Sequence, residues 1–529
     1  MLSTATMTAN NKNVKDGNVE GNLKKGKEPL VETCPVSVTA ADEENAAGVE
    51  EHTCKPSENA EHSRSTRDKP STGYRKNPVP PIVTEFADYH VYNETEVWKN
   101  GLGYMYVLPE CILLRIIFSL PFPDILSLSS ASKALYILTG DEEVWKERWK
   151  AIVKKGVVTL HFKGSWKMTC LHPQLDSTRK FKVANRLRID GFYSPWYSKK
   201  WYLTFVELKH FSSCPQTVER RSNLSVEEFQ SEYAAKNKPV LITDALKNWP
   251  AMQKWQIGEI GKHYGNSIVR TSDLDGDGHR LQSTISDFLE YCSEQSDLDP
   301  LYIFDPNYWR SCDGITDDYS VPPYFPLDLF SLLEGHAAKK RKLWRWIVFG
   351  PGRSMTKFHI DPCRTAAWNA LIAGRKRWAF YPPSFMLPPG GGTRYNAEDD
   401  SWENIIPEPL QWYVENYPHL PESIRPIECI QEPGELLFVP TGWWHSVLNL
   451  ETTVAVTHNF VDQFNIKQVW YDLQRSAASD EDYVDLLNKW SALLQVLFFP
   501  KMIRLTFPAH SSPLTTILFC NLHFLLFFL

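Results

Sequence analysis

Apolar residues follow two different spacings along the chain, and the change from one to the other separates two kinds of structure. Between residues 108 and 149 they recur every three or four positions, which indicates short helices with one buried face. Between residues 238 and 440, short runs rich in β-branched and aromatic residues are bounded by Gly and Pro, which indicates strands. The pattern predicts a small all-α module followed by a larger α+β domain.

The strands of the larger domain are predicted from four runs. These runs cover residues 238–243, 343–350, 366–381 and 434–440, and a Gly-containing turn divides the third. Ahead of them, Ser225 and Glu228 have the spacing of a capping box, which predicts a helix from Ser225 to about Ala235. We therefore expect this helix to lead into the first buried strand.

The smaller module has three predicted helices, at residues 108–121, 124–133 and 142–149. Pro109 lies near the start of the first helix, where its missing N–H is tolerated. Trp145 and Trp149 are one helical turn apart in the third. An ordinary small helical bundle has the same periodicity, so the pattern alone indicates only that each helix buries one face.

The two ends of the chain lack both patterns. Residues 1–78 have no aromatic side chain before Tyr74 and are rich in Asn, Lys, Glu, Ser and Thr, so we predict that they are disordered. Residues 496–529 are rich in Phe and Leu, but residues 513–529 barely have the length of a membrane span, and Asn521 and His523 lie in their middle. We favour an atypical terminus over a membrane anchor, and we expect no signal peptide.

Composition limits the class of protein. With 529 residues, of which 43% are hydrophobic, the chain is long enough for a large core. A net charge of -6 and a pI near 6.2 argue against a nucleic-acid-binding surface over the whole chain. The basic run at residues 339–342 is either a nuclear-import signal or a solvated strand edge. The ten cysteines include no Cys-x-x-Cys pair, which is typical of a reduced, intracellular protein.

Three residues carry the strongest chemical signal. His359 and Asp361 are two positions apart, so on a strand both side chains point to the same side. His445 follows the predicted strand at residues 434–440 and the turn after it. Two imidazoles and one carboxylate can hold Fe(II) on one face and leave three positions open for a co-substrate and O₂. The pattern predicts an oxygenase site.

An oxygenase that uses 2-oxoglutarate also needs a cation for the far carboxylate of this co-substrate, because that carboxylate leaves water on binding. Lys376 is the candidate, since alternation on its strand places Arg375 and Arg377 on the other face. A solvated basic hairpin would explain the two arginines but not Lys376. Short polar residues that interrupt apolar strands usually have a partner when buried. Asn369, Thr356 and Thr457 are short polar residues of this kind, each within an otherwise apolar stretch.

These residues lie within three stretches, 346–362, 367–378 and 433–450, that closely resemble the Jumonji-C hydroxylases. Within that family the chain is most similar to the nuclear lysyl hydroxylase and proposed arginine demethylase once called the phosphatidylserine receptor. The resemblance covers residues 218–472 and implies a double-stranded β-helix, the jelly-roll or cupin fold, with flanking helices. It implies iron at His359, Asp361 and His445. It also implies 2-oxoglutarate binding by Asn369, Lys376, Thr457, Thr356, Tyr302 and Trp346, and a substrate contact at Asn459.

The resemblance implies an activity as well. With Fe(II), 2-oxoglutarate and O₂, such an enzyme hydroxylates a side chain of a protein, as a lysyl hydroxylase does. Hydroxylation of an N-methyl group on arginine or lysine would instead release formaldehyde and remove the methyl group. Both reactions stay open, and the expected substrate is a histone or another protein. The resemblance also implies a nuclear location, with the cytoplasm as a second one.

The helical module resembles an F-box over residues 104–150. Leu108 and Pro109 at its start, a Ser-rich second helix, and Trp145 with Trp149 at its end carry this resemblance. It implies docking to a Skp-type adaptor of a cullin ubiquitin ligase, and it leaves open a non-enzymatic function as a receptor of ubiquitination targets. We expect a connector at residues 151–217, a C-terminal helix at 473–495 and an atypical hydrophobic tail at 496–529.

Overall fold

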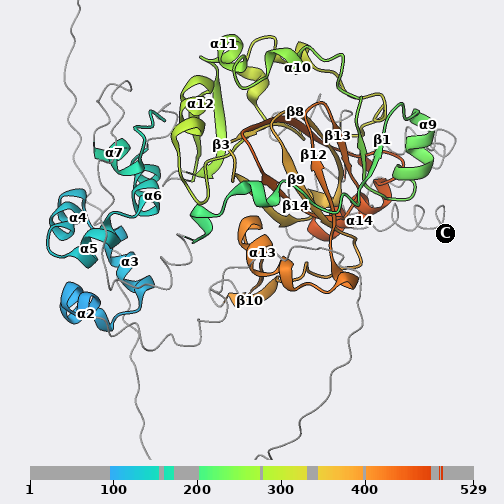
Figure 1. The fold of residues 1–529 in the computed structure, drawn as a ribbon. Helices are drawn as coiled ribbons and strands as arrows, with labels where there is room; N and C mark the ends of the chain where they lie inside the picture. Colours follow the sequence, from blue (N-terminus) through green and yellow to red (C-terminus); the bar gives the residue numbers. More distant parts are fainter. Residues whose placement is uncertain are drawn as a thin grey trace, which may run out of the picture. The chain divides into compact units, whose positions relative to one another are not determined.

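The computed structural model describes residues 96–153, 160–171, 202–274, 278–330, 344–396 and 401–477, together with Asn488, Trp490 and Ser491. The predicted disorder of residues 1–78, the basic run at 339–342 and the hydrophobic tail at 496–529 lie outside these residues. Figure 1 shows the strands of the larger domain facing one another, with helices around them.

The small module has four helices where the sequence predicted three. They are α3 (Glu110–Ser119), α4 (Phe122–Ser129), α5 (Lys133–Thr139) and α6 (Glu142–Ile152). The helix predicted over residues 124–133 is present as α4, but its predicted end is wrong, because α4 ends at Ser129 and Ser132 caps a further helix, α5, that was not predicted. The Ser132 hydroxyl accepts a hydrogen bond from Leu135 N at 3.1 Å. Apolar side chains of α3, α5 and α6 then pack into one small core.

Two sheets face each other in the larger domain. The larger sheet has the order β1 (Glu219–Arg221), β2 (Val240–Ile242), β13 (Leu436–Val439), β8 (Ala366–Ala373), β15 (Thr453–Phe460), β6 (Arg345–Gly350), β5 (Ile303–Asp305), β3 (Ile268–Leu274) and β4 (Arg280–Thr284). The smaller sheet has the order β12 (Ile427–Gln431), β9 (Lys376–Tyr381), β14 (Trp444–Asn449) and β7 (Met355–His359). From β6 to β9, and again from β12 to β15, each strand lies in the opposite sheet to the one before it. This winding is a double-stranded β-helix and confirms the predicted fold class.

Alternation along β8 divides its side chains between the two faces of the larger sheet. Trp368 and Ile372 belong to the core under the flanking helices, whereas Leu371 lies in the barrel interior with Tyr302. The helices α10 (Ala251–Lys254), α11 (Ile260–Tyr264) and α12 (Ile285–Glu294) flank the larger sheet, and α13 (Pro409–Glu415) packs on the smaller one (Figure 1). The helices therefore cover the outer faces, and the inner faces of the two sheets enclose the barrel interior.

The lead-in to the barrel agrees with the sequence. Ser225 and Glu228 form the predicted capping box, and α9 (Val226–Phe229) continues as a π-helical turn at Gln230–Ala234. All three residues of β2 are buried, as expected for the predicted strand at residues 238–243. A hairpin of β10 (Gly392–Asn396) and β11 (Ser401–Ile405) was not predicted.

The last part of the predicted connector, residues 202–217, packs on the outer face of the smaller sheet; we call it the strap. Phe211 of the strap shares a core with Tyr381 and Trp444. Arg353, in the turn between β6 and β7, donates to Leu203 O at 2.9 Å. The strap therefore covers the sheet that carries both predicted histidine ligands.

The strap also closes the free edge of the smaller sheet. β12 is the edge strand, and its outward N–H groups would otherwise be exposed for pairing with another chain. Glu428 N donates to Thr217 Oγ1 at 2.8 Å, and Ile430 N donates to the Gln216 side chain at 3.3 Å. Side chains of the strap thus take the place of a further strand.

A buried carboxylate joins the helical module to the lead-in of the barrel. Trp166, on the connector helix α7 (Trp166–Leu171), donates from Nε1 to both Asp297 carboxylate oxygens at 2.9 Å. The Tyr291 hydroxyl, from α12, donates to Asp297 Oδ2 at 2.7 Å. Lys146 on α6 donates to Asp299 O at 2.5 Å. These contacts make α6, α7 and α12 parts of one continuous core.

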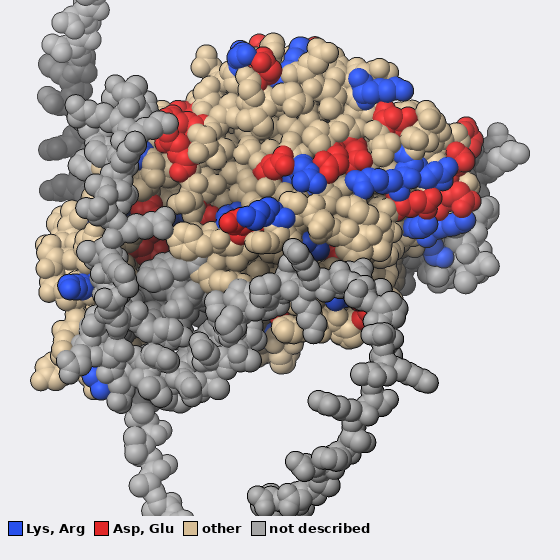
Figure 2. Space-filling view, in the orientation of Figure 1, with Lys and Arg blue, Asp and Glu red and all other residues tan. Residues whose placement is uncertain are grey.

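Acidic and basic side chains are interleaved on the face of the molecule seen in Figure 2. Many described charges are paired, for example Lys238 with Glu219 at 2.8 Å and Arg375 with Glu432 at 2.9 Å. A nucleic-acid backbone is recognised by a surface of positive charge, and the described part of this face offers none.

Among the described helices, none alone is long and apolar enough to span a membrane. The bent pair Lys99–Val107 and Ile112–Ser119 has the length and apolar composition of a span only when its two helices are taken together.

Candidate metal centre and co-substrate pocket

The three predicted metal ligands meet inside the barrel. His445 lies on β14, His359 is the last residue of β7, and the two are register partners. Asp361 Oδ1 lies 3.8 Å from His359 Nε2 and 3.9 Å from His445 Nε2. One atom of each residue lies within 4.8 Å of the others, so a single ion can contact all three. Alternation implied that a single strand carries both His359 and Asp361. The strand β7 instead ends before Asp361, which precedes the 3-10 helix η9 (Pro362–Arg364).

A β-bulge in β7 turns Thr356 and His359 to the same side. Val447 pairs with Thr356 and His445 pairs with His359, so a step of two residues on β14 matches a step of three on β7. Residues 445 and 447 lie on the same face of β14. Because of the extra residue on β7, their partners His359 and Thr356 also lie on one face, although they are three residues apart. Both Thr356 and His359 consequently face the barrel interior.

Backbone carbonyls hold both imidazole rings. His359 Nδ1 lies 2.8 Å from Lys357 O, and His445 Nδ1 lies 3.1 Å from Trp443 O. A carbonyl oxygen can only accept, so each Nδ1 carries the proton and each Nε2 keeps a lone pair for a metal. Burial, and after it the neighbouring His359, lowers the pKa of His445 to about 4. His445 is therefore neutral near pH 7, the state that binds a metal.

Asp361 fits a cation. Its second carboxylate oxygen, Oδ2, is buried and has no hydrogen-bond partner among the described residues. A buried carboxylate oxygen without a partner is costly unless a cation balances it. Two lone pairs on Nε2 atoms beside this carboxylate form the donor set that divalent iron accepts.

Lys376 is the buried cation of the pocket. Its side chain is 1% exposed, and its hydrogen-bond partner among the described residues is the Tyr302 hydroxyl, at 3.4 Å. Burial lowers the pKa of Lys376 to about 7. Lys376 pairs in register with Asn449 on β14, four residues beyond His445. A dicarboxylate that contacts a metal at one end of these strands would find its second partner at the other.

Asn449 and Ser354 lie beside Lys376 and were missed by the sequence analysis. Asn449 Nδ2 donates to Ser354 Oγ at 2.8 Å, and the Ser354 hydroxyl donates to Pro351 O at 2.6 Å. Burial raises the pKa of Tyr302 to about 12, and a hydrogen bond with Asn449 acts against this rise. Alternation from His445 could have found Asn449, since the two are four residues apart on one strand.

Three further predicted residues form a row across the larger sheet. Thr457 pairs in register with Trp346 on one side and with Asn369 on the other. Asn369 Oδ1 is buried and has no hydrogen-bond partner among the described residues, so it can accept from a ligand. Asn459 also lies on β15, and its Nδ2 donates to Thr365 Oγ1 at 2.9 Å. Thr365 follows Asp361 by four residues in the sequence. The structure thus gathers the predicted pocket residues around one interior.

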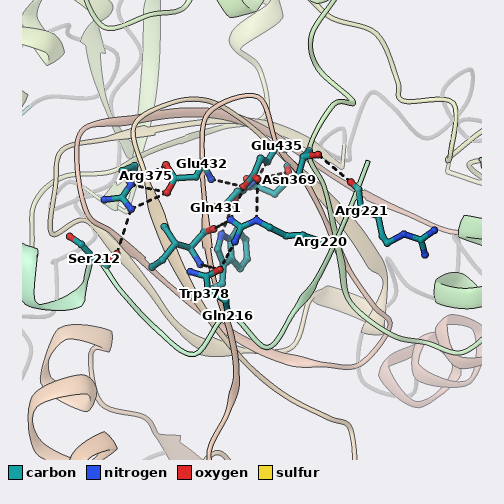
Figure 3. Close-up of polar contacts among 12 residues, drawn as sticks. Ser212, Gln216, Arg220, Arg221, Asn369, Arg375, Trp378, Gln431, Glu432 and Glu435 are labelled. Carbon is teal, nitrogen blue, oxygen red and sulfur yellow. Dashed lines mark hydrogen bonds and ion pairs between the residues drawn. The ribbon is translucent and has the colours of Figure 1, made fainter. Parts of the chain in front are cut away.

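A buried glutamine fixes the two sheets against each other behind the pocket (Figure 3). Gln431 Nε2 donates to Asn369 O at 2.9 Å, and Trp378 Nε1 donates to Gln431 Oε1 at 2.9 Å. Gln431 also pairs in register with Lys376. The strand that carries Asn369 is therefore tied to the strands around Lys376. The surrounding network contains the ion pairs of Arg220 with Glu435 and of Arg375 with Glu432.

Arg375 and Arg377 flank Lys376 and turn outward from the pocket, as alternation predicted. Arg377 is nevertheless not solvated as in the basic-hairpin interpretation. It pairs with Glu428 at 2.7 Å, with both side chains buried, and lies 4.2 Å from the centre of the Tyr413 ring. The sequence could not show this burial, because it depends on α13 and the strap covering the sheet.

Comparisons with known proteins agree with this geometry. Residues 226–466 match the family described as cupin-like domain, and residues 106–147 match the F-box domain. The lysine-specific demethylase JMJ21 of Arabidopsis thaliana is 38% identical over 71% of this chain, which spans 39% of that relative's length. The arginine-specific demethylase JMJ22 of the same plant is 32% identical over 73% of each chain. The bifunctional arginine demethylase and lysyl-hydroxylase psr-1 of Caenorhabditis elegans is 36% identical over 56% of this chain and 72% of its own length.

Fold, donor set and relatives lead to one assignment. Two histidines and a carboxylate whose buried oxygen has no partner among the described residues fit iron. A buried lysine whose described partner is a neutral tyrosine hydroxyl fits a dicarboxylate. Both resemblances in the sequence, to the Jumonji-C hydroxylases and to the F-box, are confirmed. The chain therefore belongs to the Jumonji-C family of cupin-like oxygenases, which depend on iron and 2-oxoglutarate, and it carries an F-box domain.

Proposed function

We propose that this protein oxidises a side chain of another protein, with hydroxylation of lysine as the leading reaction. One observation carries the proposal. His359, Asp361 and His445 place ligand atoms within 4.8 Å of one another, and the buried Lys376 lies at the other end of the same strands. Apolar side chains would fill a barrel interior at lower free-energy cost, so this arrangement indicates a ligand site.

Each predicted residue has a part in this proposal. The iron ligands would be His359, Asp361 and His445. Lys376 and Tyr302 would pair with the far carboxylate of 2-oxoglutarate, and Asn369, Thr356, Thr457 and Trp346 would line its binding site. When bound, iron and 2-oxoglutarate supply the chemistry that inserts an oxygen atom of O₂ into a C–H bond. The residues of the chain fix the ligands, exclude water and direct one carbon of the substrate toward the metal.

The names of the relatives favour two reactions on protein substrates. One relative is named as a lysyl-hydroxylase and arginine demethylase, and two are named as demethylases. Demethylation is therefore the second candidate, acting on methylated arginine or lysine. Asn459 would lie at the entry of the substrate in either case, since its side chain is bonded to Thr365 next to the metal ligands.

Peptide turnover separates the two reactions. The full chain, with Fe(II) and 2-oxoglutarate, is incubated with unmodified lysine peptides and with methylated histone peptides, and His359→Ala serves as the inactive control. A mass gain of one oxygen atom without formaldehyde supports hydroxylation, while formaldehyde with loss of one methyl group supports demethylation. Absence of both products and of succinate with every peptide refutes the enzymatic proposal.

We further propose that the F-box docks a Skp-type adaptor of a cullin ubiquitin ligase. Seven large apolar side chains are exposed in the described part of this module, among them Tyr104 at 97%, Val107 at 67%, Ile116 at 38% and Ile112 at 37%. Apolar side chains gathered on an exposed face mark a surface that binds another protein. Co-purification of the adaptor with the full chain tests this docking, and it would support a substrate-receptor function beside the enzymatic one.

A nuclear location, with the cytoplasm as a second one, remains our proposal for where the protein acts. It is supported by the resemblance to a nuclear hydroxylase and by the basic run at residues 339–342. Fluorescent tagging tests it, with a variant in which the four basic residues are replaced by Ala. Exclusion of the unmodified protein from the nucleus contradicts the proposal.

A further inference from the structure

The turn that follows Asp361 has an unusual backbone conformation. Cys363 has φ 57° and ψ 21°, and Arg364 has φ 55°, although neither is glycine. Side chains with a Cβ rarely adopt this left-handed region, and two such residues in succession require support from the structure around them. Backbone bonds within the turn, such as Arg364 N to Asp361 O at 2.9 Å, supply only part of that support.

The helix α14 (Ile466–Ala477) supplies the rest. Cys363 is buried in a core with Val469 and Leu473 of this helix. Arg364 Nε lies 3.4 Å from Asp472 Oδ1, also on α14. The strained turn is therefore anchored to the helix by one apolar contact and one ion pair.

Arg364 also reaches the turn that precedes the third ligand. Gly442, three residues before His445, has φ 72°, and a Cβ placed on it would lie 3.4 Å from Arg364 Nη1. The guanidinium group thus lies against the turn of His445, while its own backbone follows Asp361. Arg364 is thus part of the turn that follows Asp361, and its side chain lies against the turn of His445 and pairs with α14.

We propose that Arg364 is a positioning residue for the metal centre: held by Asp472 of α14, it keeps the turns of Asp361 and His445 at the separation that a shared ion requires. This rests on the proposed metal site. α14 thereby becomes a support for the metal centre, and the left-handed turn persists because its strain is balanced by these contacts.

Mn²⁺ alone, added to the purified full chain and followed by electron paramagnetic resonance, measures the effect without turnover. Arg364→Ala and Asp472→Ala should each weaken Mn²⁺ binding about tenfold, and the double variant should be no weaker than either, because the two residues act as one unit. Arg394→Ala is the matched control, since it removes a solvent-exposed ion pair of 3.0 Å with Glu403 on the β10–β11 hairpin. It should leave Mn²⁺ affinity unchanged.

Arg364→Gly separates positioning from general stability. Glycine adopts the left-handed conformation without strain, so the metal-free melting temperature should not fall below that of Arg364→Ala, and Mn²⁺ binding should still be about tenfold weaker than in the unmodified chain. Wild-type affinity in Arg364→Ala, or affinities that simply follow the melting temperatures, would overturn the inference while leaving the metal site intact. Failure of the unmodified chain to bind Mn²⁺ more tightly than His359→Ala would overturn both proposals.

Discussion

The affinity for 2-oxoglutarate should fall as the pH rises from 6 to 8, because Lys376 loses its proton in this range. Burial lowers the pKa of Lys376 to about 7, and among the described residues Lys376 has no carboxylate partner to restore it. The dicarboxylate binds the protonated amine, so binding at high pH must take up a proton. The metal ligand His445 does not interfere, since its pKa is lowered to about 4.

The magnitude follows from the protonated fraction of Lys376. With a pKa of about 7, the amine is roughly 90% protonated at pH 6 and roughly 10% protonated at pH 8. The apparent Kd should therefore rise about tenfold between these values, or about 1.4 kcal/mol of binding free energy.

The free energy of unfolding should rise with pH, whereas the affinity for 2-oxoglutarate falls. The unfolded chain holds this proton up to a pH of about 10, so unfolding of the co-substrate-free protein becomes harder between pH 7 and pH 10.

Isothermal titration of 2-oxoglutarate into the Mn²⁺-loaded chain measures both the affinity and the proton uptake, the latter from buffers of different ionisation enthalpy. Uptake should approach one proton at pH 8 and fall toward zero at pH 6. Lys376→Met is the control, and it should bind weakly without any pH dependence. An affinity that is flat across this range, or a slope that survives in Lys376→Met, would refute the assignment of the buried amine to the far carboxylate.

Three further substitutions test the framework around the site. Arg377→Met leaves the buried Glu428 carboxylate without its cation and should destabilise the chain by about 3–5 kcal/mol in urea unfolding, while Arg377→Met with Glu428→Met should recover part of the loss; an unchanged midpoint would contradict the burial of this pair. Ile116→Asp, at an exposed position of α3, should prevent co-purification of the Skp-type adaptor without changing Mn²⁺ affinity, and retention of the adaptor would argue against this docking face. Gly374→Ala places a Cβ 2.1 Å from Thr452 O at φ 76°, and should lower the stability by more than about 1 kcal/mol in thermal unfolding; a neutral result would show that the β8–β9 turn can move.

Strand alternation made most of the pocket predictable. The period of two is a property of any strand, so the sequence alone could place Lys376 inward and its neighbours Arg375 and Arg377 outward. It could not reveal the bulge that turns Thr356 and His359 to one side. That bulge depends on how β7 pairs with β14, a register between segments far apart in the chain. Local pattern carries no information about such pairing.

Burial by distant segments was the second limit. The sequence analysis interpreted Arg377 as compatible with a solvated hairpin, and nothing within its own strand indicates otherwise. Its environment is made by Tyr413 of α13 and by Phe211 of the strap, whose carbonyl accepts from Arg377 at 3.5 Å. The strap belongs to a region that composition marks only as a connector. Its role in the barrel is apparent only in the structure, where backbone carbonyls of the strap accept hydrogen bonds from Arg375 and Arg377.

In the described part of the barrel interior, the buried cation Lys376 and the half-buried carboxylate Asp361 do not neutralise each other. Lys376 and Asp361 lie toward opposite ends of the paired strands β9, β14 and β7, and the Lys376 amine bonds to Tyr302. An ion pair between them would lower the cost of burying both charges and would leave nothing for a ligand to gain. Their separation keeps a carboxylate oxygen available for a metal and an ammonium group available for a carboxylate. These two charges lower the stability of the fold while they are unbalanced. They favour binding of a metal at Asp361 together with a dicarboxylate that extends from the metal to Lys376.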